Sequence, residues 1–130
     1  MEVDASDAGD ALVIEGDDRG IRRALVNLLA NAIAWTPHGR AIAVRLRAHV
    51  EGAEVTFADD GYGVPPTDVA ALFERVRPAP SRRGAGSGLG LYLVRRIAEG
   101  HGGTIAYAPR LEGGSTFTLT LPLCAAAVLR

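Results

Sequence analysis

The sequence predicts a two-layer α/β sandwich, in which one mixed, mostly antiparallel sheet is covered on one face by about three helices. Short alternating strands occur in adjacent pairs separated by tight turns, which is typical of antiparallel hairpins. The helical segments between them have one apolar face each, so each needs a sheet to cover it. No repeat or linker divides the 130 residues, so we expect one domain over 1–130 with its core at about 11–123.

The elements are expected in the order strand, helix, hairpin, short helix, loop, helix, hairpin. The first strand is predicted at Ala11–Glu15, and either Asp17 or Asp18 is placed to cap the helix that follows. From Ile21 to Trp35, apolar residues recur every three or four positions. This period predicts a helix with one buried face.

Two half-buried strands follow this helix. Apolar residues alternate with arginine in "AIAVRLRAHV" (41–50), and "AEVTFADD" (53–60) has the same period of two. A short helix is then predicted within "VPPTDVAALFERV" (64–76), with Thr67 as its cap.

The C-terminal third is expected to form a loop, a helix and a hairpin. The composition of "RPAPSRRGAGS" (77–87) indicates a loop, and "LGLYLVRRIAEGHGG" (89–103) indicates a helix that Gly102 and Gly103 end. The segment "TIAYAPRLEGGSTFTLTLP" (104–122) predicts two strands around a turn.

Composition excludes several classes of function. The net charge of -1 gives no basis for nucleic-acid binding, and no apolar run has the length of a membrane span. Cys124 is the only cysteine, which excludes an internal disulfide and a cysteine-rich metal site. All 14 basic residues, histidine aside, are arginine, and the chain has no lysine. This excludes a lysine-containing phosphate loop and a Schiff-base lysine. We therefore expect neither a nucleic-acid partner nor direct membrane contact from this domain.

Four glycines alternate in "GAGSGLGLYLV" (84–94), directly before a predicted helix. Glycine lets the backbone approach a ligand closely, and the free N–H groups of a helix N-terminus bind anions. The run does not fit the dinucleotide fingerprint G-x-G-x-x-G. By itself it is consistent with a phosphate site and with an ordinary flexible loop.

The only two asparagines, Asn27 and Asn31, lie four positions apart in the first predicted helix. They share one face of that helix, with Trp35 one turn further along. An amide oxygen is a suitable ligand for Mg²⁺, a cation that prefers oxygen and is often shared with substrate phosphates. Surface or packing amides are the alternative, and for such residues alone the commoner case.

Asp59 and Asp60 precede Gly61 and Gly63 at the end of a predicted strand. A carboxylate in a pocket there can accept a hydrogen bond from the exocyclic amine of adenine. A plain turn is the alternative, because Asp-Gly is a common turn sequence.

Arg77, Arg82 and Arg83 lie on the loop before the glycine run. Arginines on a mobile loop suit a lid over a triphosphate, where guanidinium groups stabilise the charge of the transferring phosphoryl group. A solvated basic loop is the alternative for each of them.

In this order the motifs resemble the catalytic ATP-binding domain of sensor histidine kinases, within the superfamily that includes gyrase, Hsp90 and MutL. "NLLANAIAWTP" is similar to the asparagine box, "DDGYGVP" to the first glycine box, "LFERV" to the phenylalanine box and "GSGLGLYLV" to the second glycine box. "GHGGTI" and "GGSTFTLTLP" match the closing strands. The resemblance implies the Bergerat-type ATP-binding fold.

The resemblance also implies a role for each matching residue. Asn31 would hold Mg²⁺ between the phosphates of ATP, and Asp59 would bind the adenine amine. Trp35 would stack on adenine, with a buried core tryptophan as the alternative, and Ser115 would support Asp59 through water. The other residues expected to bind nucleotide are Asn27, Gly61, Gly63, Phe73, Gly86, Gly88, Leu89 and Gly90, and Arg77, Arg82 and Arg83 would act with Asn31 in catalysis.

Position 27 distinguishes phosphoryl transfer from hydrolysis. The ATPases of the superfamily have a glutamate there that activates water, whereas Asn27 cannot act as a base. The resemblance therefore implies transfer of the γ-phosphoryl group to a histidine on a separate dimerisation domain absent from this chain. The further partner would be a response regulator receiver domain, and the location would be cytoplasmic, whether or not the parent protein is anchored in a membrane.

Two alternatives stay open. The first is an anti-sigma-factor-type serine kinase, against which Asn27 argues. The second is a degenerate pseudokinase module that acts through protein contacts. It is supported by Ala34, where many relatives have a lysine or arginine, by Val76 in place of a second aromatic, and by the short segment between Phe73 and Gly86.

Overall fold

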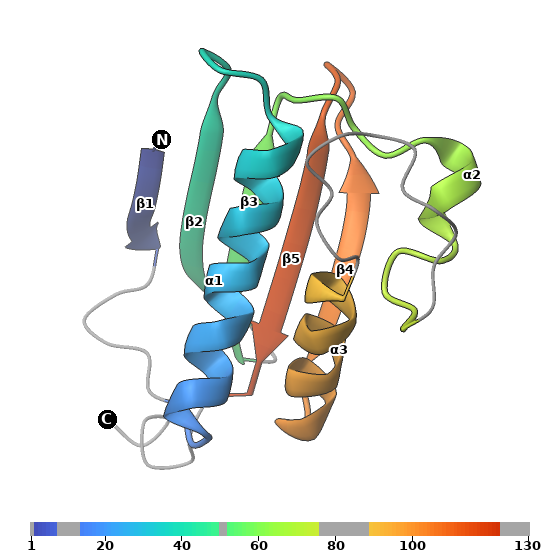
Figure 1. Ribbon diagram of the computed structural model, residues 1–130. Coiled ribbons are helices and arrows are strands. Elements are labelled where there is room, and N and C mark those ends of the chain that lie inside the picture. The colour runs from blue at the N-terminus through green and yellow to red at the C-terminus, as the bar shows by residue number, and fades with distance from the viewer. Residues whose placement is uncertain (1, 8–13, 50–51, 76–88, 123–130) are drawn as a thin grey trace.

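The computed structural model describes residues 2–7, 14–49, 52–75 and 89–122. Within these ranges the chain forms one sheet with helices on one face (Figure 1). None of the described helices is long and apolar enough to cross a bilayer. The elements are β1 (Glu2–Asp7), α1 (Asp18–Trp35), β2 (Ile42–His49), β3 (Gly52–Asp59), α2 (Pro66–Val69), α3 (Gly90–Gly100), β4 (Thr104–Pro109) and β5 (Ser115–Leu121).

The sheet has five strands in the order β1-β2-β3-β5-β4. β1 pairs with β2 in parallel, and the other three pairs are antiparallel. The predicted fold class, a mixed and mostly antiparallel sheet under a helical layer, is therefore confirmed. β3 lies at the centre of the sheet, and its last residue, Asp59, is paired with Ile42 on one side and with Ser115 on the other.

The strand expected at Ala11–Glu15 is tested only at its last two residues, and a strand that was not predicted forms one edge of the sheet. The strand that forms is Glu2–Asp7, whereas Ile14 and Glu15 are outside any strand and residues 11–13 lie outside the described residues. Ile14 is partly buried and packs against the core. β1 has an acidic sequence in which apolar and polar residues hardly alternate. The sequence therefore carries no strong signal for this strand.

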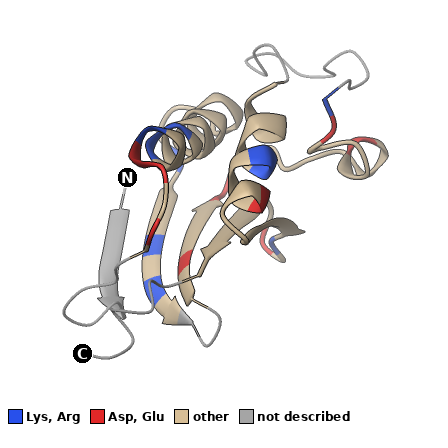
Figure 2. Cartoon of the chain, turned by 90° about the horizontal axis from the view of Figure 1, so that it is seen from below, with Lys and Arg blue, Asp and Glu red and all other residues tan. Residues whose placement is uncertain are grey.

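Helix α1 begins three residues before its predicted start, and Asp17 is its cap. The Asp17 side chain accepts a hydrogen bond from the backbone N–H of Arg19 at 3.2 Å. Asp18 instead occupies the first turn, where its negative charge is favourable, and forms an exposed ion pair with Arg22. In Figure 2 the ribbon at this end of the helix has red and blue stretches next to each other, which mark acidic and basic residues.

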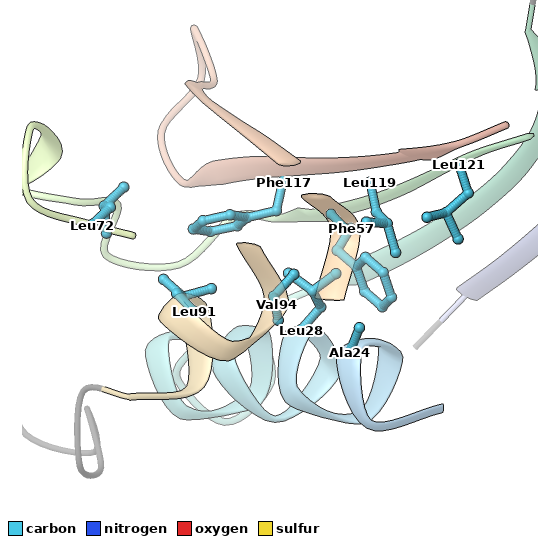
Figure 3. Close-up of a cluster of buried hydrophobic side chains, with 10 residues drawn as sticks. Ala24, Leu28, Phe57, Leu72, Leu91, Val94, Phe117, Leu119 and Leu121 are labelled. Atoms are coloured by element: carbon cyan, nitrogen blue, oxygen red, sulfur yellow. The ribbon is translucent and has the colours of Figure 1, made fainter. Parts of the chain in front are cut away.

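The core lies between the helical layer and the sheet (Figure 3). α1 and α3 pack against each other and present small and aliphatic residues to β3 and β5. Phe117 of β5 is at the centre of an aromatic group, with Phe73 edge-on at 6.2 Å and Tyr107 at 5.3 Å between ring centroids. The buried members are Ala24, Leu28, Phe57, Leu72, Leu91, Val94, Ala98, Phe117, Leu119 and Leu121.

The prediction that Thr67 caps the short helix is wrong. α2 begins at Pro66, so Thr67 lies inside the helix and its hydroxyl contacts Asp68. Pro65 is the residue at the cap and makes no side-chain cap hydrogen bond. Proline at the start of a helix has the required φ and lacks one N–H that would need a partner, so a polar cap is not needed.

The end of α3 agrees with the prediction. Helical hydrogen bonding ends at Gly100 and His101, and Gly102 turns the chain with a φ of 76°. The N–H of Gly103 then bonds to the carbonyl of Ala98 at 2.8 Å before β4 begins. A left-handed glycine is the usual way to end a helix and start a strand.

Candidate functional site

Several of the predicted functional residues lie at one end of the sandwich, where α1 and β3 end and β5 begins (Figure 1). Asp59 is the last residue of β3 and Ser115 the first residue of β5, and the two are paired across the ladder. Trp35 is the last residue of α1. The fold thus brings together three positions that are widely separated in the sequence.

Asp59 is the buried carboxylate of this site, with 2 % of its surface exposed. Its Oδ1 accepts a hydrogen bond from the N–H of Gly61 at 2.9 Å, and the backbone N–H of Ser115 also bonds to the carboxylate. Burial is the largest influence and raises the pKa of Asp59 above its ordinary value of 3.8, against these hydrogen bonds and the attraction of Arg110, which lower it. Burial of an ionised carboxylate costs free energy. A buried carboxylate that can still accept further hydrogen bonds is therefore typical of a ligand-binding group.

The turn after Asp59 packs directly on the end of α1. The N–H of Tyr62 donates to the carbonyl oxygen of Trp35 at 3.1 Å. A Cβ at Gly61 would collide with that same carbonyl oxygen and lie 2.9 Å from the Cα of Thr36. Gly63 has a φ of 74°, a conformation that side chains disfavour. Both glycines are therefore required by the backbone geometry beside Asp59.

Trp35 is buried, with 7 % of its surface exposed. Its carbonyl supports the glycine turn, so the residue has a structural role whatever its ring contacts. Its burial agrees with the alternative of a core tryptophan. Stacking of its ring on adenine stays a prediction. Ser115 is also buried, at 3 % exposure, and its backbone N–H donates a hydrogen bond to the Asp59 carboxylate. A water-mediated role for its hydroxyl stays a prediction.

The two asparagines have different surroundings. The amide nitrogen of Asn27 donates to the carbonyl oxygen of Gly90 at 3.3 Å, which joins α1 to the first residue of α3. Asn31 is half-buried, and its side chain forms no hydrogen bond with any residue that the structure describes. The alternative of a packing amide therefore fits Asn27, whereas the amide of Asn31 is available to a ligand.

The other predicted residues fall into two groups. Phe73 is partly buried in the aromatic group around Phe117, so its observed role is in the core. Leu89 is exposed at the cap of α3, and a Cβ at Gly90 would meet open space. The predicted residues that lie outside the described part of the chain are Arg77, Arg82, Arg83, Gly86 and Gly88.

Arg110 is a residue of this site that sequence reasoning missed. Its Nη1 donates to the backbone carbonyl oxygen of Asp59 at 3.0 Å, across 51 positions of the chain. A lone arginine in a hairpin turn gives no signal by itself. The register of β5 on β3 supplies the signal, because it places the start of β5 and the turn before it at the end of β3.

Among the described residues, no group of three His, Cys, Asp or Glu side chains is arranged to hold a metal ion. A cation at this site would therefore depend on an amide oxygen and on oxygens of the ligand itself. Asn31 is the residue of this site whose amide is available for such a role.

Comparison with known proteins supports these observations. Residues 16–125 match the family described as "Histidine kinase-, DNA gyrase B-, and HSP90-like ATPase". The chain is 40% identical over 120 residues to the sensor-like histidine kinase SenX3 of Mycobacterium tuberculosis H37Rv, covering 90% of this chain and 29% of that protein. It is 38% identical over 117 residues to the sensor histidine kinase CusS of Escherichia coli K12, covering 88% and 24%. The chain thus spans less than a third of these two relatives.

Solved structures agree. The mycobacterial sensor histidine kinase MprB has a TM-score of 0.75 at 36% identity, over 85% of this chain and 76% of that one. The catalytic domain of histidine kinase ThkA has a TM-score of 0.80 at 26% identity, over 93% and 76%. The named relatives are all histidine kinases, and three of them are named as sensor kinases, which favours that interpretation over a serine kinase or a degenerate module. The chain belongs to the histidine kinase-, DNA gyrase B- and HSP90-like ATPase family, as a catalytic ATP-binding domain of the sensor histidine kinase kind.

Proposed function

We propose that this domain binds ATP together with Mg²⁺ and presents the γ-phosphoryl group to a histidine on a separate dimerisation domain. The observation that carries the proposal is the buried carboxylate of Asp59, fixed by backbone N–H groups from Gly61 and Ser115. A carboxylate held in this way still has acceptor capacity for the exocyclic amine of adenine. The base would therefore be recognised by a group whose position the backbone determines.

The proposed metal ligand is Asn31. Its half-buried amide has no competing partner among the described residues, and an amide oxygen suits Mg²⁺. When bound, the cation would neutralise charge on the phosphates and so assist phosphoryl transfer. With few protein ligands, the ion would be held mainly through ATP.

The same helix favours transfer over hydrolysis. Asn27 is an amide with no basicity at neutral pH, and its nitrogen is engaged with the carbonyl of Gly90. Water near the γ-phosphate would therefore lack a general base at this position. Catalysis would depend on positioning and charge neutralisation, to which we assign Arg77, Arg82 and Arg83, with Gly86, Gly88 and Gly90 allowing close approach of the phosphates.

The relatives are named as sensor histidine kinases, which supports a proposal for the partners of this domain. Because the chain spans only 29% of SenX3 and 24% of CusS, the phosphorylated histidine would lie in another part of the parent protein. The phosphoryl group would pass from there to a response regulator receiver domain. We place the domain in the cytoplasm, where ATP is available.

The test is a calorimetric titration of the domain with ATP and with ADP, with and without Mg²⁺. Wild type is expected to bind in the micromolar range. Asp59→Asn is expected to lose about 100-fold in affinity, because a neutral amide replaces the charged acceptor and brings an NH2 donor into a buried site that needs acceptors. Asn31→Ala is expected to remove the magnesium dependence. Asp18→Asn, at an exposed ion pair of α1, is the matched control and should bind as wild type does.

Two results would contradict the proposal: no binding by wild type at millimolar nucleotide, or unchanged binding by Asp59→Asn. If binding is confirmed, a histidine-bearing dimerisation domain is added in trans with labelled ATP. Label should then appear on that domain, and little free phosphate should be released in its absence.

A further inference from the structure

The turn between β4 and β5 has a geometry that directs one side chain back toward β3. The N–H of Arg110 bonds to the carbonyl of Gly114 at 3.3 Å, and the N–H of Gly113 bonds to the carbonyl of Arg110 at 3.1 Å. Gly113 and Gly114 have φ values of 102° and 98°, which glycine alone adopts without strain. The turn is therefore fixed by its own backbone.

Within this turn, Arg110 is the link to the base-binding carboxylate. Its Nη1 lies 3.0 Å from the carbonyl oxygen of Asp59, and its side chain is 32% exposed. Its acidic neighbour in the turn, Glu112, is 3.9 Å away and 80% exposed, so it competes weakly for the guanidinium. Arg110 thus contacts the end of β3 more closely than it contacts its neighbour in the turn.

The charges around Asp59 come from few described groups. Asp60 is its neighbour on the chain and raises the pKa of Asp59, whereas Arg110 lowers it. Arg40 contacts the backbone carbonyl of Asp60 at 3.4 Å, and the carboxylate of Glu112 lies 3.9 Å from the guanidinium of Arg110. Because burial also raises this pKa, Arg110 is the described cation that opposes both burial and Asp60.

We propose that Arg110 is a positioning residue for the nucleotide base. It fixes the end of β3 to the β4–β5 turn, and its positive charge beside Asp59 makes the site prefer a purine with an amino group at C6 over one with a carbonyl group at C6. This inference rests on the proposed function, since it assumes that Asp59 receives the base.

The chemistry of the preference lies in the protonation state of one carboxyl group. An ionised carboxylate only accepts hydrogen bonds, so it pairs with the amine of adenine and is opposed by the carbonyl oxygen of guanine. A protonated carboxyl group carries a donor and tolerates that oxygen. A cation that favours the ionised form therefore favours ATP over GTP.

Two measurements test this role over a pH range that starts at the ordinary aspartate value of 3.8 and extends upward to about pH 8. The first follows the titration of the Asp59 carboxyl carbon by NMR without nucleotide. The second gives Kd for ATP and for GTP at each pH. Titration of the nucleotides' own phosphates is common to all variants and cancels in the comparison.

Arg110→Gln removes the charge and keeps a hydrogen-bond donor. We expect the Asp59 titration, and the loss of ATP binding as pH falls, to move upward by roughly half a pH unit to one pH unit. The ratio of ATP to GTP affinity should fall by roughly three- to tenfold at mildly acid pH, since one pKa unit corresponds to a factor of ten. Arg110→Lys keeps the charge and should keep both midpoints near those of wild type.

Glu112→Lys provides a second variant with the opposite sign, at an exposed position that should not disturb folding. It should move the Asp59 midpoint downward, and it decides the question if Arg110→Gln fails to fold. Midpoints and an ATP-to-GTP ratio that stay at their wild-type values would overturn the inference, even if affinity fell uniformly. Midpoints that move as expected in a protein that binds no ATP would instead contradict the proposed function.

Discussion

The two sides of the candidate site are built differently. The base side consists of Asp59, the glycine turn and the start of β5, and backbone hydrogen bonds fix each part to the sheet or to the end of α1. The side with Asn27 and Asn31 lies between α1 and α3, where the Asn27 side chain donates one hydrogen bond to the carbonyl oxygen of Gly90 at 3.3 Å. We infer that base recognition is preorganised, whereas the metal and phosphate side is completed by the ligand.

The largest expected effect tests the rigidity of the base side. Gly113 and Gly114 have similar positive φ values, but a Cβ at Gly113 would meet open space, whereas one at Gly114 would collide with the Asp59 carbonyl oxygen. Gly114→Ala should lower the free energy of unfolding by roughly 3–5 kcal/mol, and Gly113→Ala by about 1 kcal/mol. Urea denaturation measures both losses. Equal losses would contradict the close packing of Gly114 against the Asp59 carbonyl oxygen.

The next effect separates the two sides by ligand. ADP without Mg²⁺ presents the base without the cation. Asp59→Asn should then weaken ADP binding by about 100-fold, and Asn31→Ala should leave it within about threefold of wild type. Fluorescence or calorimetric titration measures the two values. A comparable loss in both variants would mean that the sides cannot be separated.

A smaller effect is expected from the link between α1 and α3. Asn27→Ala removes the hydrogen bond to Gly90 and should lower the free energy of unfolding by about 1 kcal/mol. Asn27→Asp keeps the shape but loses the donor, so it should show a similar loss. Val26→Ala, at the next and exposed position, is the control and should change stability by less than about 0.5 kcal/mol. Thermal melts followed by circular dichroism provide the comparison.

The smallest effect is the pH dependence of stability from Asp59. Because its pKa is raised, the folded state binds more protons than the unfolded state between 3.8 and the raised value. The contribution of Asp59 to stability therefore falls as pH rises through that interval and is constant above it. The stability of Asp59→Asn relative to wild type should rise over the same interval. A difference that falls instead would contradict the burial argument.

Much of the architecture could be predicted because the segments with regular apolar patterns also form the core. The alternation in 41–50 and 53–60 and the helical period up to Trp35 all gave elements close to those observed. Local chemistry predicted a cap at either Asp17 or Asp18, of which Asp17 is the cap observed, and it predicted the glycine after α3. β1 was missed because an acidic edge strand is held by backbone pairing, which leaves little side-chain pattern.

The site was predicted less completely. Asp59, Gly61 and Gly63 are contiguous in the sequence, so a motif could show them together. Arg110 reaches Asp59 only through the register of two strands, and that register is a tertiary property. Whether Asn31 is available also depends on its neighbours in the fold, which the spacing to Asn27 does not show.

The glycine turn has a further consequence for the link between α1 and β2. Tyr62 bonds to Trp35 at 3.1 Å, and the carboxylate of Asp60 accepts from the N–H of Ala41 at 2.8 Å. Hydrogen bonds to Tyr62 and Asp60, both close to Asp59, thus hold the two ends of the 36–41 segment. His38 lies within this segment and is exposed. A fluorophore attached there through His38→Cys, with Cys124 replaced, would be a sensor of nucleotide occupancy that touches neither the base nor the core.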